Sequence, residues 1–364
     1  MTYAIFSIIA SQVSTSGCSS YTYQQYSEQP YARAPWFFLS EQLVDDYTAN
    51  GGTHPAYPFL TGAGGANQVT VFGYLGLRLV PDFILHVNPS LPPQISNLKF
   101  RTIYWQGWPI SAAANQTHTT LTRLSTPYMD ANMTFANIPI QVQVGNDNST
   151  TYQLSPNGTI TLTNRNIGNV TTIPGNIAQC LPVTSPDAFQ PGQFPISAVD
   201  GAASTKWQPS RSNTSQSMTV DLSTQIIQPI TGFFFDWAQS PPANFSVFFH
   251  NTSSVRASNT TTTYSSSGIQ ISEPYNATLE SLITPYTSNT TNVTLPQPIY
   301  SGTYATLMIQ GNLGNLFNNG TGATVAEWAI IGSSGQRLTT RGTKEQQQVS
   351  STWKRFMRRG RPGV

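Results

Sequence analysis

The chain has 364 residues, of which only 9% are charged, and this length allows two or three domains with cores of their own. Residues 1–336 carry nine basic and 14 acidic residues, a net charge of −5, whereas eight of the 17 Lys and Arg residues lie after them. An acidic, sparsely charged body argues against a nucleic-acid partner, which would need clustered Lys and Arg on a folded face. No apolar run reaches the ~18 residues of a transmembrane helix, so we expect no membrane span.

Helical spacing of apolar residues marks the first part of the chain. It predicts a helix over residues 2–13 and another over residues 36–47. The run YAIFSIIA has no basic residue before it, so it is interpreted as a buried helix and not as a signal peptide, which suggests a true N-terminus upstream of Met1. A third helix is expected from about Asn67 to Leu79, with a glycine-rich loop leading into it.

Alternating strands dominate the rest of the chain. Residues 81–170 predict a small antiparallel β-sandwich, and residues 180–335 predict a second sandwich or jelly roll, because short β-branched and aromatic runs alternate with Gly, Pro, Asn and Ser. Residues 171–195 contain five prolines and are interpreted as a linker that overlaps the start of the second sandwich. Residues 336–364 are expected to form a basic, disordered tail.

Sequons for N-glycosylation are frequent and begin only at residue 115. Their number and spacing favour a eukaryotic secretory route. The only two cysteines, Cys18 and Cys180, either form one bridge or remain two partly buried thiols. The candidate glycosylation sites are Asn115, Asn132, Asn148, Asn157, Asn169, Asn213, Asn244, Asn251, Asn259, Asn276, Asn289, Asn292 and Asn319.

Three long motifs carry a family resemblance: PWFFLSEQLVDD, GGTHPAYPFLTGAGGANQVTVFGYLGLRLVPD and LPPQISNLKFRTIYWQGWPI. With them, residues 1 to about 165 resemble the C-terminal part of fungal acid trehalases, glycoside hydrolase family 65. The resemblance implies that residues 1–80 are the last helices of an incomplete (α/α)6 catalytic barrel and that residues 81–170 are the family's C-terminal β domain. The expected fold is therefore multi-domain and mainly β.

A second resemblance covers residues 180–335. Asp200-Gly201, Thr205-Lys206-Trp207, Val220-Asp221-Leu222 and Glu327-Trp328 are similar to the pattern of discoidin, or coagulation factor 5/8 C-type, modules. Such modules often bind sugars in loops at one end and equally often act as structural spacers. A cell-wall glycan is therefore a candidate partner of this module.

The candidate catalytic site lies between Pro35 and Arg78. Inverting hydrolysis of a glycosidic bond needs a carboxylic acid and a carboxylate that activates water. Glu41 stands where the family's hydrolases carry this general base, with Asp45 and Asp46 in reserve, whereas no upstream segment matches the loop of the general acid. Candidate substrate-binding residues are Gly52, Thr53, His54, Thr61, Gly62, Gly64 and Gly65.

The resemblance thus implies part of an inverting α,α-trehalase, with trehalose or a related glucoside as substrate and an extracellular, cell-wall or vacuolar location. Because the general acid is absent, we expect the chain to be inactive alone. Two alternatives stay open: a non-catalytic carbohydrate-binding or wall glycoprotein, and a disaccharide phosphorylase. No His, Cys and acidic residues stand at metal-ligand spacing, so neither a metal nor a cofactor is expected.

Overall fold

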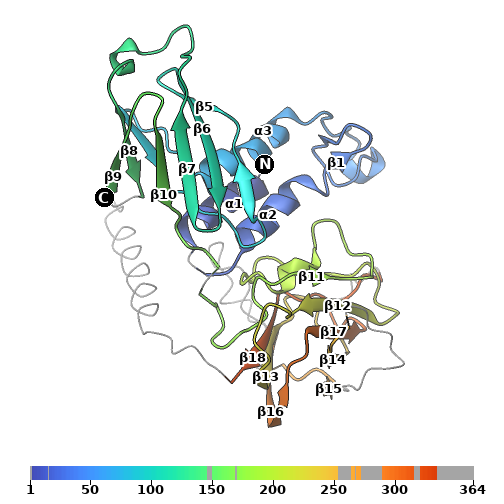
Figure 1. The fold of residues 1–364 in the computed structure, drawn as a ribbon. Coiled ribbons are helices and arrows are strands. Elements are labelled where there is room, and N and C mark those ends of the chain that lie inside the picture. Colours follow the sequence, from blue (N-terminus) through green and yellow to red (C-terminus); the bar gives the residue numbers. More distant parts are fainter. Residues whose placement is uncertain are drawn as a thin grey trace, which may run out of the picture.

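The computed structural model describes residues 2–14, 16–145, 150–168, 170–252, 264–266, 268–271, 289–314 and 320–333. It contains a helical segment, a first β unit beside it and a second β unit on the other side of the helices (Figure 1). Strands outnumber helices, so the expected multi-domain, mainly β fold is confirmed. The expected tail, residues 336–364, lies outside the described residues.

The helical segment consists of α1 (Thr2–Val13), α2 (Ser19–Glu28) and α3 (Leu60–Gln68), which continues as a π-helix over Val69–Tyr74. A short β-hairpin, β1 (Ala32–Arg33) with β2 (Phe38–Leu39), follows α2. The expected bounds of the first helix are confirmed. Its expected burial is only half right, because α1 buries the small residues Ala4, Ser7 and Ser11 and turns its large apolar side chains outward.

The first β unit has two layers. One sheet has the order β10-β7-β6-β4, with β5 also paired to β6, and the other has the order β3-β8-β9. β3 and β8 run parallel, whereas the expectation was a wholly antiparallel sandwich. Its core is shared with the helices, since Ala4, Val69 and Leu75 pack with its buried strand residues. The strands are β3 (Ile84–Val87), β4 (Asn97–Lys99), β5 (Ile103–Trp105), β6 (Trp108–Asn115), β7 (His118–Arg123), β8 (Ile140–Val144), β9 (Thr150–Leu154) and β10 (Thr159–Thr163).

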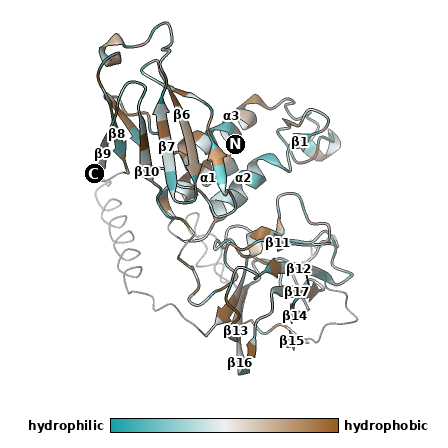
Figure 2. Cartoon of the chain, in the orientation of Figure 1, coloured by the Kyte–Doolittle hydropathy of each residue, from teal (hydrophilic) through white to brown (hydrophobic). Residues whose placement is uncertain are grey.

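The second β unit is an antiparallel sandwich. One sheet has the order β11-β12-β17-β14-β15 and the other the order β16-β13-β18. Its core is aromatic, with Trp207, Trp237, Trp328 and Phe235 fully buried, and Figure 2 shows hydrophobic residues along β13. The strands are β11 (Val183–Thr184), β12 (Gln216–Asp221), β13 (Pro229–Asp236), β14 (Asn244–His250), β15 (Tyr264–Ser266), β16 (Thr290–Tyr300), β17 (Tyr304–Gln310) and β18 (Glu327–Gly332).

The helix expected over residues 36–47 is wrong. This stretch contains β2 and turns, and Phe37 has a φ of +56°, a conformation that no residue inside a right-handed helix can adopt. Its apolar residues have helical spacing, but most are exposed: Leu39 is buried, whereas Trp36 and Phe37 are 75% and 70% exposed. A helix in a protein is stabilised mainly by packing of its apolar face, so a helical pattern with little to pack against does not favour a helix.

The third helix begins earlier and ends earlier than expected. The expected glycine-rich loop, which contains Gly62 and Gly65, lies inside α3, because these glycines are buried and allow close packing. The helix ends before Gly76, whose φ of +66° turns the chain back against Asn88. The helix α2 was not expected at all, because its sequence SSYTYQQYSE lacks the aliphatic residues that mark a helical face.

The segment interpreted as a linker, residues 171–195, packs against the second β unit. Ile177 donates its backbone N–H to the Ile330 carbonyl of β18 at 2.9 Å, and Ala178, Cys180 and Phe194 are buried. Cys180 forms a disulfide with Cys18, which decides between the two states left open for the cysteines. Residues 171–195 are therefore packed on the second β unit, although they contain five prolines.

We expect Gly76→Ala to destabilise the protein and Gly64→Ala to stabilise it. A Cβ at Gly76 would lie 2.4 Å from the Asn88 carbonyl oxygen in a left-handed backbone, so the loss should reach at least about 1–2 kcal/mol. Gly64 sits in α3 with nothing within 4 Å of its added Cβ, so helix propensity should raise stability by up to about 1 kcal/mol. Urea unfolding would measure both changes, and a loss of stability in Gly64→Ala would contradict the helix.

Candidate functional site

A loop after α2 carries the candidate catalytic residues, and Arg33 holds it together. Arg33 donates from Nη2 to the carbonyls of Gln42 and Leu43, at 2.8 and 3.1 Å, and from Nε to Asp45 Oδ2 at 2.5 Å. Ser40 donates from Oγ to the other Asp45 oxygen at 2.5 Å. One guanidinium therefore fixes the loop that follows Glu41 through a planar fork of donors.

Glu41 lies on the surface at the start of this loop. Its backbone N–H donates to the Ala56 carbonyl at 3.1 Å, and its side-chain Oε2 accepts from the Ala56 N–H at 3.0 Å. The other oxygen, Oε1, accepts no hydrogen bond from any part of the chain that the structure describes. The carboxylate is therefore oriented through one oxygen and open to solvent through the other.

The segment that braces Glu41 contains Gly52, Thr53 and His54. Gly52 donates its N–H to the Tyr47 carbonyl at 3.1 Å, Thr53 donates to the Asn50 carbonyl, and the His54 ring lies 5.2 Å from the Tyr47 ring. His54 also borders an open pocket of about 470 Å³, whose walls do not include Glu41. The pocket is lined by Arg33, Ala34, Asp45, His54, Pro55 and Tyr57.

The remaining expected substrate-binding residues sit on α3. Thr61 and Gly64 are exposed, whereas Gly62 and Gly65 are buried, and Gly62 lies against the ring of Phe59. Phe59 donates its N–H to the Leu39 carbonyl at 2.7 Å, so α3 begins beside the strand that precedes Glu41. The fold thus brings the two halves of the expected site together, but Gly62 and Gly65 serve packing.

The two reserve carboxylates are both engaged in holding the loop. The Arg33 side chain lowers the pKa of Asp45, and the Ser40 hydroxyl lowers it further. Hydrogen bonds from the Thr48 side chain and backbone lower the pKa of Asp46, whose Oδ1 accepts both at 2.8 Å. A carboxylate with a lowered pKa is a poorer proton acceptor, and both reserve carboxylates are already engaged in hydrogen bonds within the loop.

Arg33 is a residue of the candidate site that the sequence did not single out. It is the only basic residue before Arg78, so its isolation beside an acidic stretch was the available signal. A surface ion pair contributes little by itself, but this side chain also binds three backbone carbonyls, including that of Pro30 at 3.0 Å. Arg33 also lines the pocket beside His54.

A second cluster of carboxyl groups is buried in the second β unit. Asp200 is fully buried and accepts from the Ala202 N–H at 2.9 Å and from the Thr205 hydroxyl. Glu327 is 4% exposed; its Oε2 accepts from the Gly201 N–H at 3.0 Å, while its Oε1 has no partner among the described residues. Burial raises the pKa of Asp200 to about 7.

The pKa of Glu327 is also shifted by burial. Burial raises the pKa of Glu327 well above its usual range, and the charges of Asp200 and the buried Asp236 raise it further. The two buried acids therefore favour their protonated forms. Within the described ranges, no group of three or more His, Cys, Asp or Glu side chains is arranged to hold a metal ion.

The described sequons differ in how accessible they are. Asn115, Asn157 and Asn213 are exposed, whereas the side-chain amide of Asn289 donates to the Ala238 carbonyl at 2.7 Å. A glycan on Asn289 would take one of the two hydrogens of this amide nitrogen and would have to fit beside the Ala238 carbonyl. The expected sites Asn148, Asn169, Asn259, Asn276 and Asn319 lie outside the described residues.

Comparison with known proteins identifies relatives. Residues 80–130 match the glycosyl hydrolase family 65, C-terminal domain. A cell wall acid trehalase of Arthroderma benhamiae is 53% identical over 361 residues, which cover 92% of this chain and 34% of that protein. The acid trehalase of Emericella nidulans is also 53% identical, over 91% of this chain and 33% of that protein. The chain thus spans about a third of the length of these relatives.

More distant similarities were also found. A cell wall acid trehalase of Candida albicans is 30% identical over 285 residues, which cover 71% of this chain and 24% of that protein. Among solved structures, the chitosan-binding module 1 of a Paenibacillus chitosanase/glucanase is 16% identical, with a TM-score of 0.32 over 43% of this chain and 98% of that module.

We expect the stability of the protein to fall as the pH rises from about 4 to 7. Asp200 has a folded-state pKa of about 7 against an ordinary value of 3.8, so over this interval the folded state holds a proton that the unfolded state has released. Each such carboxyl lowers the free energy of unfolding by roughly 1.4 kcal/mol per pH unit.

Urea unfolding at pH 4.5, 5.5 and 6.5 in a chelating buffer would measure this slope. Asp200→Asn and Glu327→Gln should each flatten it, whereas Asp46→Asn, which removes an exposed carboxylate, should not. An unchanged slope in both buried variants would show that these acids are ionised in the folded state.

Proposed function

Because the chain is related to fungal acid trehalases over about nine tenths of its length, we propose that it is part of an inverting glycoside hydrolase that converts α,α-trehalose to two glucose molecules. In this proposal residues 1–80 are the last helices of the catalytic barrel, residues 81–170 are the C-terminal β domain and residues 180–335 are a discoidin-like module. The sequence relationship carries the proposal, and the geometry around Glu41 supports it.

Glu41 is proposed as the general base. In an inverting reaction a carboxylic acid protonates the leaving glycosidic oxygen, the C–O bond breaks, and water activated by a carboxylate attacks the anomeric carbon from the opposite face. A base for this step needs one oxygen held in place and one open to water. The Ala56 N–H supplies the first condition, and the unoccupied Oε1 supplies the second.

The general acid is proposed to come from a part of the polypeptide that lies against this segment. Large apolar side chains face outward on α1 and around β2, and such surfaces usually mark interfaces. They would be covered by the rest of a helical barrel. These side chains include Phe6, Ile9 and Val13 on α1 and Trp36, Phe37 and Phe38 around β2, and Leu60 at the start of α3 is exposed as well.

A secretory location is the second part of the proposal. The relatives are named cell wall, periplasmic or secreted acid trehalases, and exposed sequons such as Asn157 and Asn213 suit an extracellular, cell-wall or vacuolar enzyme. The described residues contain no helix that is both long and apolar enough to cross a membrane. A cell-wall glycan is a further proposed partner, through the discoidin-like module.

The 364-residue chain should release no glucose from trehalose when it is purified alone. In this proposal Glu41 activates water, and the acid that protonates the leaving oxygen comes from outside this chain. A coupled glucose assay at pH 4 to 6, with an active acid trehalase as positive control, makes the measurement. Trehalose hydrolysis by the pure chain would contradict the absence of the acid.

Within the longer polypeptide that contains this segment, Glu41→Gln should lower kcat by about 10²–10⁴-fold with little change in KM. The amide keeps the acceptor for the Ala56 N–H but cannot take a proton from water. Asp130→Asn is the matched control, since it removes an exposed carboxylate that lies outside the loop. A near-normal kcat in Glu41→Gln would exclude Glu41 as base, and activity that required inorganic phosphate would favour a phosphorylase.

A further inference from the structure

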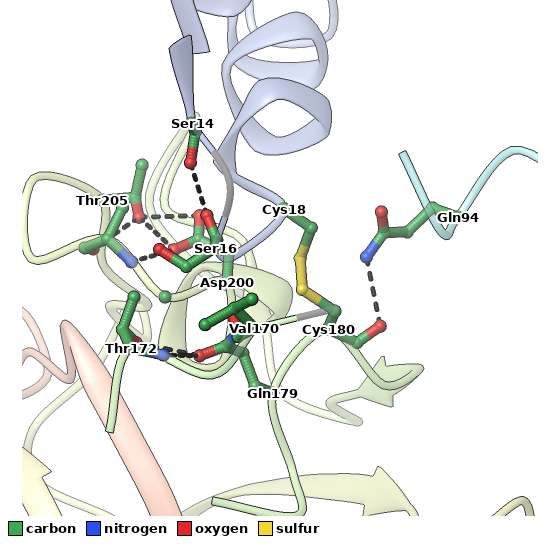
Figure 3. The surroundings of a disulfide bond; sticks show 12 residues. Ser14, Ser16, Cys18, Gln94, Val170, Thr172, Gln179, Cys180, Asp200 and Thr205 are labelled. Carbon is green, nitrogen blue, oxygen red and sulfur yellow. Dashed lines mark hydrogen bonds between the residues drawn. A yellow bond between two sulfur atoms is a disulfide. The ribbon is translucent and has the colours of Figure 1, made fainter. Parts of the chain in front are cut away.

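The junction between the helical segment and the second β unit is built around α2. At the start of this helix the Cys18–Cys180 disulfide joins residues 162 positions apart, and Cys18 donates its N–H to the Asp200 carbonyl at 2.7 Å (Figure 3). Gly17 and Gly201 bring their backbones together here, since a Cβ added to Gly201 would lie 2.8 Å from the Gly17 Cα. This end of α2 is locked to the second β unit.

The middle of α2 is held by aromatic contacts. The Tyr26 ring stacks on Tyr3 of α1 with centroids 3.8 Å apart, and its other neighbour is Gly192 of the second β unit. A Cβ at Gly192 would lie 1.9 Å from the ring, so only glycine fits. Phe194 meets the ring edge-on, and Tyr23 shares a hydrogen bond with Ser204.

The far end of α2 leads directly into the candidate site. Tyr31 donates its N–H to the Glu28 carbonyl, and its own carbonyl accepts from the Ser40 N–H at 2.8 Å, one residue before Glu41. Arg33 ties the Pro30 carbonyl to the loop after Glu41. The same helix therefore connects the second β unit at one end with the candidate base at the other.

We propose that the second β unit is a positioning element for the Glu41 loop, and that the end of the sandwich formed by residues 187–206 has α2 of the same chain as its partner, and not a glycan. The assignment of a catalytic role to this loop rests on the proposed function, but the mechanical coupling does not. Tyr26 and the Cys18–Cys180 disulfide act as positioning residues, because they touch the loop only through α2.

The coupling can be tested by hydrogen–deuterium exchange on the full chain, which requires no trehalose hydrolysis. Tyr26→Ala removes the wedge between Tyr3 and Gly192, so the amides of Phe37, Ser40 and Glu41 should exchange at least about tenfold faster. Tyr26→Phe keeps the ring and should restore slow exchange. Tyr300→Ala, which removes an exposed tyrosine elsewhere in the same β unit, is the matched control.

A second variant removes the covalent link: Cys18→Ser combined with Cys180→Ser should accelerate exchange at the same amides. Amides of β6 and β7 report global destabilisation, and their exchange should rise less than that of residues 37–41. Unchanged exchange at residues 37–41 in both variants would overturn the proposal. So would protection of residues 187–206 by an added soluble chitosan oligosaccharide or β-glucan oligosaccharide, because that end would then be a glycan site.

If both the coupling and the proposed function hold, Tyr26→Ala in the longer polypeptide should lower kcat more than it raises KM, with recovery in Tyr26→Phe. A coupling seen by exchange without any trehalose hydrolysis in the longer polypeptide would retain the positioning role and reject the proposed function.

Discussion

The close backbone contact between Gly17 and Gly201 is the constraint on which the arrangement of this chain depends. Two segments can approach so closely only where neither carries a side chain, and both glycines have a positive φ that other residues rarely adopt. The contact places Cys18 beside Cys180 and directs α2 along the surface of the second β unit. The disulfide and the contacts of Tyr26 and Tyr23 with the second β unit follow along the same helix.

The sequons are not spread evenly over the chain. Residues 1–114 contain no sequon, and they include the outward apolar side chains of α1 and the β2 region. A glycan at such a place would block an interface, whereas the exposed Asn157 and Asn213 lie in the two β units. The exposed sequons therefore lie outside the N-terminal segment, whereas exposed apolar side chains occur in the β units as well, for example at Met129 and Ile226.

The strands were predictable because their burial follows local alternation. In ITGFFFDWA, Phe233 and Phe235 are buried on β13 as the alternation indicates, and VAEWAIIG forms β18 beside it. The parallel pairing of β3 with β8, in contrast, depends on contacts between residues that are distant in the sequence. No short window of sequence contains that information.

The helices were harder to predict because the face that each helix buries depends on packing partners that are distant in the sequence. α1 packs through Ala4, Ser7 and Ser11, so its conspicuous apolar stripe marks the side turned away from the rest of this structure. The residues 36–47 have the same kind of stripe, but with nothing to cover they form a hairpin and turns. The apolar periodicity therefore identified an exposed apolar stripe in both segments, but only α1 is a helix.

The candidate site shows the same limit at the level of single residues. Glu41, His54 and the start of α3 were expected to lie together, and backbone bonds to Ala56 and Leu39 do join their segments. Arg33 stands out in the sequence only as the single Lys or Arg before Arg78, and its contacts could not be predicted, because three carbonyls and one carboxylate meet it only in the folded loop. Its position next to α2 also makes the loop sensitive to whatever moves that helix. Through α2, the packing of Tyr26 against Gly192 is connected to the loop that carries Glu41, so the proposed positioning of this carboxylate involves residues distant from it in the sequence.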